Sequence, residues 1–442
     1  MTVTTERLTT DQILQLNREY TFFSWSAQAK INPIVIDRAE GIYFWDPDGK
    51  RYIDFNSQLM SVNIGHGDRR VADAIAEQAH RLAFAAPQFA TEVRGRLGQL
   101  LAELTPGDLN TFFFTLGGAE ANENALRMAR MVTGRQKVIA RYRSYHGATA
   151  GAISATGDPR RWANEPGVPG IVRVMDPYRY GKPEPDPVHE HLAYLDEVIQ
   201  YEGPHTIAAF IVETVTGTNG ILIPPGGYLQ GVRELCDRYG ILLIADEVMA
   251  GFGRTGRWFA VDNWDVVPDL LTMAKGLTSS YLPLGAVAMR PQIAQHFSDK
   301  VYYGGLTYSA HPVSCAAAIA AVSVLRDDDL IGNAARLGPV MADHLARLKA
   351  NHPSVGSVRS IGLFGIVELI RNTETREPMA PFNGSSPEMA ALDARLKADG
   401  LYTMQHWDGF FTNPPLCITE EQLGEAFGII DAALEVTDAA VR

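Results

Sequence analysis

The sequence predicts an α/β protein with a mainly parallel sheet covered by helices. From residue 71 onward, stretches with helical spacing of apolar residues alternate with short apolar runs, which is the pattern of a parallel sheet with crossover helices. Two of those apolar runs end abruptly in charged residues. The chain has 442 residues, of which 46% are hydrophobic and 20% charged. It is therefore long enough for two or three globular units.

The elements follow in a regular order after an N-terminal part of different character. Short apolar runs at 34–36, 42–44 and 51–55, separated by polar residues 37–40 and a turn at 46–49, predict small antiparallel strands. Downstream we predict helices at 71–81, 94–104, 120–132, 227–239, 312–325 and 331–351. We predict strands at 111–115, 137–140, 208–213, 241–245, 270–274, 285–289 and 361–370. The units are expected to be an N-terminal segment 1–70, a large domain 71–326 and a C-terminal domain 327–442.

Charge and composition exclude several classes of function. Lys and Arg number 39 against 51 Asp and Glu, which gives a net charge of −12 without a basic patch, so we expect no nucleic-acid or membrane partner. Residues 1–12 are polar, and the longest apolar stretch, 315–325, is too short to span a bilayer. Cys236, Cys315 and Cys417 are far apart and lack metal-ligand spacing, so we expect reduced thiols, no metal site and a cytoplasmic protein.

The most informative residues follow two of the predicted strands. The run 241–245 leads into Asp246, and the run 270–274 leads into Lys275, one of only eight lysines. The carboxyl ends of strands in an open parallel sheet face the ligand crevice. Apolar surroundings lower the pKa of a lysine, as Schiff-base chemistry requires, and a carboxylate can keep a pyridine nitrogen protonated. The alternative interpretation is a buried ion pair that only joins two strands.

Two further segments are consistent with a phosphorylated, planar cofactor. Gly117 and Gly118 lie between a predicted strand and a helix start, where backbone N–H groups bind phosphate. A glycine pair at such a place is also compatible with a simple tight turn. Tyr145 follows the next strand and is placed to stack on a planar ring, although an isolated tyrosine also suits a core or a rim.

Taken in order, the motifs resemble the class III pyridoxal-phosphate aminotransferases, the ω-aminotransferase family of fold type I. The resemblance covers about residues 32–438 and implies a large cofactor-binding domain and a smaller α/β domain built from both chain termini. The matching segments are 54–55 and 62–67 (Asp-Phe and Val-Asn-Ile-Gly-His-Gly), 118–123 (Gly-Ala-Glu-Ala-Asn-Glu), 145–147 (Tyr-His-Gly), 246–248 (Asp-Glu-Val), 251–256 (Gly-Phe-Gly-Arg-Thr-Gly), 274–276 (Ala-Lys-Gly) and 307–312 (Thr-Tyr-Ser-Ala-His-Pro).

The resemblance implies a role for each matching residue. Lys275 is expected to carry pyridoxal 5'-phosphate and to move the proton, while Asp246 pairs with the pyridine nitrogen. Thr307 is expected to contact the phosphate of the partner subunit, which implies a homodimer or a dimer of dimers with the active site at the interface. Glu247 and Arg254 are expected to be structural. The other expected cofactor-binding residues are Gly117, Gly118 and Ala119 at the phosphate, Tyr145 and Val248 on either side of the ring, His146, and Glu213 close by.

Two departures from the family pattern concern the phosphate and the substrate. Gly117 and Ala119 stand where the family usually has serine, so we expect weaker cofactor binding through backbone donors. Residues 401–413 contain no arginine for a substrate carboxylate, and Phe411 stands nearest the usual position. The candidate substrate contacts are therefore Phe22, Trp25, Leu59, Arg141, Arg143, His406 and Phe411. Phe23, Trp407 and Phe410 belong to the same aromatic set, which either walls a pocket or forms a small-domain core.

The expected activity is transamination from an ω-amino acid or amine, such as taurine or β-alanine, to pyruvate or 2-oxoglutarate. One alternative is an aminomutase or decarboxylase, because the same fold and cofactor serve several chemistries. A second alternative is a non-catalytic protein that only binds pyridoxal phosphate. The intact pair of Lys275 and Asp246 argues against that alternative.

Overall fold

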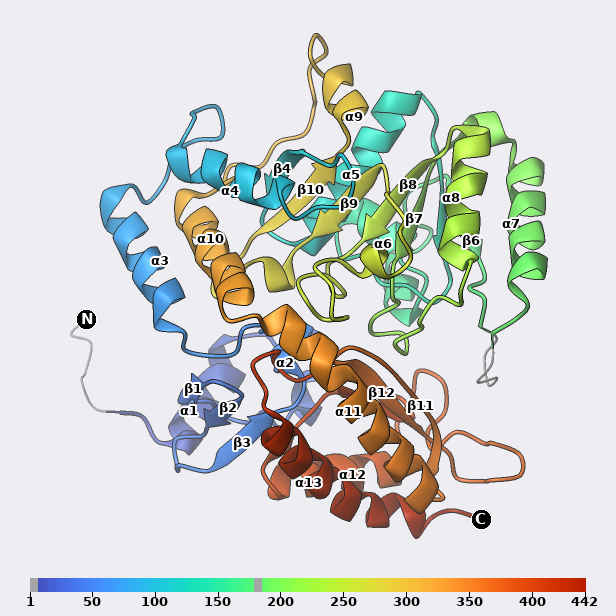
Figure 1. The fold of residues 1–442 in the computed structure, drawn as a ribbon. Helices are drawn as coiled ribbons and strands as arrows, with labels where there is room; N and C mark the ends of the chain where they lie inside the picture. The colour runs from blue at the N-terminus through green and yellow to red at the C-terminus, as the bar shows by residue number, and fades with distance from the viewer. Residues whose placement is uncertain (1–6, 179–184) are drawn as a thin grey trace.

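The central feature of the computed structural model, which describes residues 7–178 and 185–442, is a seven-stranded sheet (Figure 1). Its strand order is β4-β10-β9-β8-β7-β5-β6. Only β10 runs antiparallel to its neighbours β4 and β9, so the expectation of a mainly parallel sheet is confirmed. The strands are β4 Thr111–Thr115, β5 Lys137–Arg141, β6 Ile171–Val174, β7 Ile207–Glu213, β8 Leu242–Asp246, β9 Leu270–Met273 and β10 Gly285–Met289.

Apolar side chains on both faces hold this sheet between helices. Every residue of β7, β9 and β10 is buried, which is why these strands are continuously apolar. On one face, Ala121 and Ala125 of α5 (Gly118–Thr133) pack against Ile211. On the other face, α7 (Val188–Glu202) and α8 (Tyr228–Tyr239) cover Phe210. Helix α5 therefore runs across the sheet with its N-terminus at the edge where the parallel strands end.

A smaller body, in the lower half of Figure 1, combines strands from the N-terminal part of the chain with the C-terminal part. One of its two four-stranded sheets has the order β1-β2-β3-β13, and its strand β13 pairs in parallel with β3, Leu401 opposite Ile53. The second sheet has the order β11-β12-β15-β14. The elements are β1 Arg38–Glu40, β2 Tyr43–Trp45, β3 Arg51–Asp54, β11 Val355–Ile361, β12 Phe364–Leu369, β13 Leu401–Tyr402, β14 Gln405–His406, β15 Gly409–Thr412, α11 Leu330–Asn351, α12 Pro387–Ala398 and α13 Glu420–Asp438.

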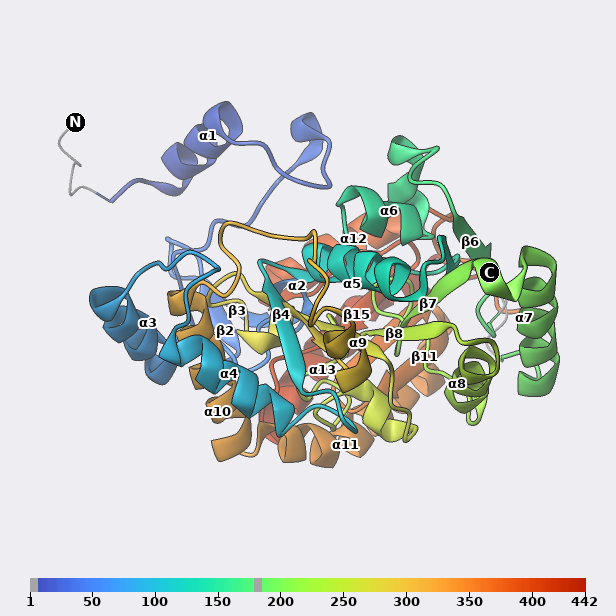
Figure 2. The same ribbon diagram turned by 90° about the horizontal axis from the view of Figure 1, so that it is seen from above.

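The remaining helices surround the sheets, except α1, which buries none of its residues and stands apart from the body in Figure 2. These helices are α1 Thr10–Tyr20, α2 Ser57–Met60, α3 Arg69–Arg81, α4 Glu92–Ala102, α6 Ala150–Ala155, α9 Pro291–His296 and α10 Pro312–Asp327. The 3-10 helices are η1 Gln28–Lys30, η2 Pro159–Asn164, η3 Pro204–Thr206, η4 Ala260–Asn263 and η5 Lys275–Leu277. Within the described residues, no helix combines the length and apolar character needed to cross a membrane.

Three expectations about the elements are wrong. Residues 34–36 form no strand, and the first strand lies in the polar segment Arg38–Glu40 instead, because its backbone pairs with β2. The apolar run 361–370 is not one strand, because Gly362 has φ +57° and turns the chain between antiparallel β11 and β12. Strand β9 stops at Met273, so Lys275 starts a 3-10 turn rather than ending a strand. Residues 1–6 of the predicted N-terminal segment lie outside the described residues.

Candidate active site

A cavity of about 400 Å³ lies at the edge where β7, β8 and β9 end. Glu213 and Asp246 are the last residues of β7 and β8 and lie opposite each other in the pairing of these strands. Lys275 follows β9, which pairs with β8 through Asp246 and Thr272. The three neighbouring strands therefore deliver two carboxylates and one amine to a single cavity. This confirms the expected arrangement of the two strand ends.

Lys275 is held in a strained backbone conformation. Its φ is +42°, in the left-handed region that non-glycine residues rarely adopt and that often marks functional sites. The next residue, Gly276, is tightly packed, because a Cβ there would lie 2.6 Å from Nδ2 of Asn63. Burial lowers the pKa of Lys275 to about 8, although the nearby carboxylates of Asp246 and Glu213 act in the opposite direction. The neutral amine is thus reached at a lower pH than for an ordinary lysine.

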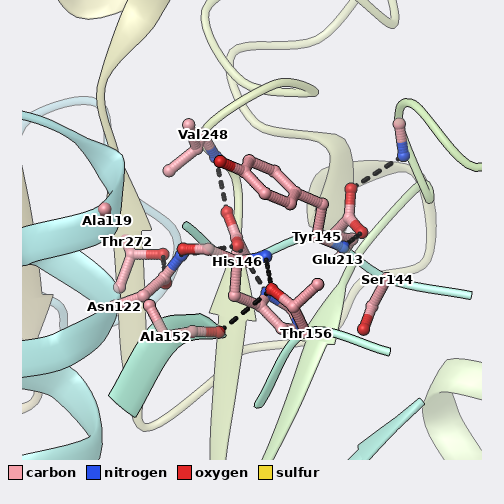
Figure 3. A network of polar contacts seen from close by, with 12 residues as sticks. Ala119, Asn122, Ser144, Tyr145, His146, Ala152, Thr156, Glu213, Val248 and Thr272 are labelled. Atoms are coloured by element: carbon pink, nitrogen blue, oxygen red, sulfur yellow. Dashed lines mark hydrogen bonds and ion pairs between the residues drawn. The ribbon is translucent and has the colours of Figure 1, made fainter. Parts of the chain in front are cut away.

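Asp246 is oriented by hydrogen bonds to both of its oxygens (Figure 3). Its Oδ2 accepts a hydrogen bond from Nδ2 of Asn122 at 2.7 Å and lies 2.7 Å from Nδ1 of His146. Its Oδ1 accepts a hydrogen bond from the backbone N–H of Val248 at 3.0 Å. The carboxyl group is buried, and these donors hold it in one position.

Asn122 was missed by the sequence analysis. It lies on α5, accepts a hydrogen bond from Oγ1 of Thr272 at 2.7 Å, and donates to the backbone oxygen of His146 at 2.8 Å. Asn122 is four residues after Gly118, so both lie on the same face of α5. That spacing is the signal that could have identified it.

Glu213 forms hydrogen bonds with two loops rather than with a side chain. Its Oε1 accepts from the backbone N–H of Tyr145 at 2.9 Å, and its Oε2 accepts from the backbone N–H of Gly217 at 2.8 Å. Burial raises the pKa of Glu213, and the negative charge of Asp246 adds to this effect. The side chain fixes the loops on either side of the cavity at the end of β7.

Tyr145 and Val248 both line the cavity, and in Figure 3 the ring of Tyr145 extends toward Val248. The guanidinium carbon of Arg160 lies 3.6 Å from the centroid of the Tyr145 ring. Val248 also packs closely against α5, because a Cβ on Gly118 would lie 2.7 Å from Cγ1 of Val248. A flat apolar space bounded by an aromatic and a branched side chain suits a planar ring.

The N-terminus of α5 provides donors for an anion. Gly117 is the N-cap residue and supplies no side-chain hydrogen bond, so the first N–H groups of the helix are not capped by it. The space at Gly117 is open, because no heavy atom lies within 4 Å of the place its Cβ would take. Ala119 lines the same end of the cavity. A phosphate group fits this turn through backbone N–H groups alone.

The other predicted residues are distributed unevenly around the cavity. Leu59 lines it, whereas Thr307 is an exposed residue in the loop between α9 and α10 and does not. Phe22 and Trp25 are 82% and 64% exposed in the N-terminal segment. Phe23 precedes Trp25 in that segment and is half-buried.

The remaining substrate candidates have other partners. Arg143 pairs with Asp176, and Arg141 donates to the backbone oxygen of Glu213 at 2.6 Å.

The aromatic candidates of the smaller body pack among themselves. His406 stacks on Trp407 with ring centroids 4.1 Å apart, and burial lowers the pKa of His406 to about 4. Phe410 and Phe411 are fully buried core residues, and Phe411 packs with Phe364 and Ile366.

Glu247 and Arg254 join different parts of the fold through hydrogen bonds. Glu247 accepts hydrogen bonds from Oγ1 of Thr214 and from the backbone N–H groups of Ala260 and Val261. Arg254 is fully buried and donates to Oγ of Ser57, Oδ1 of Asn63 and backbone oxygens of the smaller body.

Comparison with known proteins agrees with this geometry. The chain belongs to the class III aminotransferases, because the family model "Aminotransferase class-III" matches residues 25–434. It is therefore an aminotransferase that uses pyridoxal 5'-phosphate. Putrescine–pyruvate aminotransferase of Pseudomonas aeruginosa is 35% identical over 92% of this chain and 91% of its own length. Gamma-aminobutyrate transaminase 1 of Oryza sativa subsp. indica is 33% identical over 92% of this chain and 82% of its own length.

Solved structures show the same fold. Taurine:2-oxoglutarate aminotransferase from Bifidobacterium kashiwanohense, solved with pyridoxal phosphate and glutamate, is 43% identical and superposes with a TM-score of 0.96 over 99% of this chain and all of its own. An (S)-enantioselective omega-transaminase from Thermomicrobium roseum is 37% identical, with a TM-score of 0.91 over 98% of this chain and 100% of its own. The fold is therefore that of a type I pyridoxal-phosphate transferase, as expected.

Proposed function

We propose that this enzyme transfers the amino group of an ω-amino acid or amine, with taurine and β-alanine as the first candidates, to pyruvate or 2-oxoglutarate. The observation that carries the proposal is the convergence of Lys275 and Asp246 from neighbouring strands on one cavity. The relatives with 33–43% identity act, by their names, on putrescine, gamma-aminobutyrate or taurine. All of these donors carry their amino group at the end of a short chain.

Each residue around the cavity then has a defined task. The bound cofactor supplies an electron sink for the carbon that carries the amino group. Lys275 would hold the cofactor through Nζ and, once released, would move a proton with the same atom. Asp246 would hold a proton at the pyridine nitrogen, and His146 keeps Asp246 in place.

The remaining contacts bind and orient. Tyr145 and Val248 would flank the ring, and Glu213 fixes the loop that carries Tyr145. Backbone N–H groups at Gly117, Gly118 and Ala119 would bind the phosphate at the N-terminus of α5. Because no serine contributes there, cofactor binding depends strongly on the helix terminus and on any donor from outside the chain.

We assign that outside donor to Thr307 of a second copy. Thr307 is exposed and does not line the cavity of its own chain, which suits a residue that serves a neighbouring site. The active unit is then at least a homodimer with an isologous interface. Mixing Thr307→Ala subunits with Lys275→Ala subunits should restore activity, since one site of the mixed dimer carries neither change. No recovery despite subunit exchange would show that Thr307 acts within its own chain.

We also propose three units along the chain and a cytoplasmic location. A division into 1–70, 71–326 and 327–442 suits the joint between α10 and α11, which lies between Asp327 and Leu330. A cytoplasmic location suits three cysteines that are all unpaired.

A screen of donors and acceptors tests the proposed function. Purified enzyme is incubated with taurine, β-alanine, putrescine or gamma-aminobutyrate and with pyruvate or 2-oxoglutarate, and the new amino acid and the oxo product are both quantified. Equal amounts of alanine or glutamate and of the donor-derived oxo product are expected, with none from Lys275→Ala. Release of carbon dioxide, or rearrangement of the donor without an acceptor, would instead indicate a decarboxylase or an aminomutase.

A further inference from the structure

The cavity needs a cation for the far end of its substrates. A 2-oxo acid carries a carboxylate, and an ω-amino acid carries a carboxylate or sulfonate, which bind poorly without a charged partner. The charged residues that line the cavity are Glu213, Asp246 and Lys275, and Lys275 is committed to the cofactor. Residues 401–413 contain no arginine.

Three arginines near the cavity are already engaged in structural contacts. Arg141 is buried and donates to Glu213 and to Oγ1 of Thr216. Arg143 pairs with Asp176. Arg254 is fully buried among backbone oxygens. These three side chains hold parts of the fold together and are not placed to bind a ligand.

Arg160, on the 3-10 helix η2, differs from all three. Its guanidinium carbon lies 3.6 Å from the centroid of Tyr145, and its Nη2 donates to Oγ1 of Thr218 at 2.7 Å. Tyr145 and Thr218 both line the cavity. Arg160 itself is not one of the residues that line the cavity. Its side chain is 28% exposed and contacts two residues that do, so it lies directly beside the cavity wall and is not sealed in the core.

The orientation of this guanidinium is fixed, and one edge stays open. Asp158 accepts from Nε of Arg160 at 3.1 and 3.0 Å and also pairs with Nη2. Asp158 is itself held by Nδ2 of Asn219 at 3.1 Å. Throughout the part of the chain that the structure describes, Nη1 of Arg160 makes no hydrogen bond. An arginine stays charged in such a pair and presents two further N–H donors on the open nitrogen.

We propose that Arg160 binds the anionic group of both substrates, the carboxylate or sulfonate of the amine donor and the carboxylate of the oxo acid. This inference rests on the proposed function, since it names the anion-binding residue of that same cavity. The ring of Tyr145 then has two roles. It lines the cavity proposed for the cofactor, and it packs against the guanidinium of Arg160 that selects the substrate. Thr218 completes the rim beside the guanidinium.

Paired donors that differ only in the anionic group test this assignment. β-Alanine and propan-1-amine have the same three-carbon skeleton and amino position, but only β-alanine carries a carboxylate. In Arg160→Gln, KM for β-alanine and for the oxo acid should rise about ten- to a hundredfold, the loss expected for a charge-assisted contact. The KM for propan-1-amine should change by less than about threefold. Arg160→Lys should recover part of the loss, because it retains the charge without the planar fork.

Arg161→Gln provides the matched control, because it removes the same charge one residue away on η2. Arg161 pairs with Glu165 and donates to the backbone oxygen of Gly157 rather than to a residue that lines the cavity. Its kinetics with β-alanine should equal those of the wild type. An equal loss of β-alanine and propan-1-amine activity in Arg160→Gln would overturn the proposal, since it would indicate that Arg160 only supports Tyr145.

A binding measurement separates this inference from the proposed function. Ethanesulfonate and propionate, which lack the amino group, are titrated into the holoenzyme by calorimetry. Wild type and Arg161→Gln should bind both anions, and Arg160→Gln should bind them at least tenfold more weakly. If the affinities follow this pattern but the enzyme shows no transaminase activity, the anion site is supported and the proposed function is rejected. Equal affinities in all three proteins, or no binding by any of them, would reject the anion site.

Discussion

Nδ1 of His146 lies 2.7 Å from Oδ2 of Asp246, and both side chains are buried. A carboxylate only accepts hydrogen bonds, so Nδ1 carries the proton and donates it to this contact. Nε2 of His146 has no hydrogen-bond partner within residues 7–178 and 185–442. The imidazole therefore acts on Asp246 alone and positions the carboxylate together with Asn122.

Removal of this imidazole is expected to slow the chemistry more than it weakens binding. In His146→Ala, kcat should fall about ten- to a hundredfold, because the lost hydrogen bond to a charged group is worth about 1.5–3 kcal/mol. KM for the donor should change little. His146→Asn, which offers an amide donor near the same place, should recover part of kcat. Steady-state kinetics of both variants check this, and a change in KM alone would contradict a positioning role.

Asp246→Asn is expected to have a larger effect. The substitution keeps the shape of the side chain but removes the charge that holds a proton on the pyridine nitrogen, so single-turnover rates should fall by orders of magnitude. The far-UV circular dichroism and the thermal unfolding midpoint should stay close to those of the wild type. Near-normal single-turnover rates would show that Asp246 is only a structural acid.

The two glycines before α5 should respond differently to alanine. A Cβ at Gly118 would lie 2.7 Å from Cγ1 of Val248, whereas nothing lies within 4 Å at Gly117. Gly118→Ala should therefore lower the thermal stability of the apoprotein. Gly117→Ala should leave that stability unchanged and weaken cofactor binding, because its methyl group enters the space assigned to the phosphate. Unfolding curves and cofactor titrations of the two variants test this, and equal behaviour in both assays would argue against the assigned phosphate turn.

The lowered pKa of Lys275 predicts a pH-dependent stability of the apoprotein. The pKa is about 8 in the folded chain against an ordinary 10.5, so between these values the unfolded chain binds more protons and the free energy of unfolding rises with pH. Below pH 8 both states hold the proton, and the buried charge costs the folded state on the order of 3 kcal/mol. Apo Lys275→Met should accordingly be more stable than wild type at pH 7.

The difference between Lys275→Met and wild type should shrink as the pH rises from about 8 toward 10.5. Urea unfolding of both apoproteins across this range measures it, and other titrating groups cancel in the comparison. A stability difference that does not vary with pH would mean that Lys275 is not neutralised by burial.

Local sequence patterns predicted the central sheet well. Thr111–Thr115 and Gly285–Met289 were predicted with their observed bounds, because both runs are apolar and bounded by turn residues. The prediction of a single strand at 361–370 was wrong, because a two-residue turn at Gly362 and Leu363 interrupts the run and contains no polar residue that would have marked it. Strand Arg38–Glu40 was not predicted, because it carries no apolar pattern. It is a short edge strand in which only Ala39 is partly buried.

The sequence predicted the lysine and the carboxylate of the site, but not the partners brought in from other elements. Asn122 lines the cavity and bonds to Asp246, and Arg160 lies against the ring of Tyr145. Both placements depend on tertiary contacts, which no local pattern encodes. Phe411 stood near a family motif, yet its pairing with Ile366 turns it into the core of the smaller body. Whether an aromatic residue lines a pocket or a core depends on strand register, which one sequence does not fix.

The most direct test of the account is the identity of the lysine that carries the cofactor. Purified enzyme is reduced with borohydride, which fixes pyridoxal phosphate on the amine that holds it, and the digested protein is mapped by mass spectrometry. We expect the added mass on the peptide that contains Lys275 and on none of the other lysine peptides. Modification of a different lysine, with the Lys275 peptide unchanged, would contradict it.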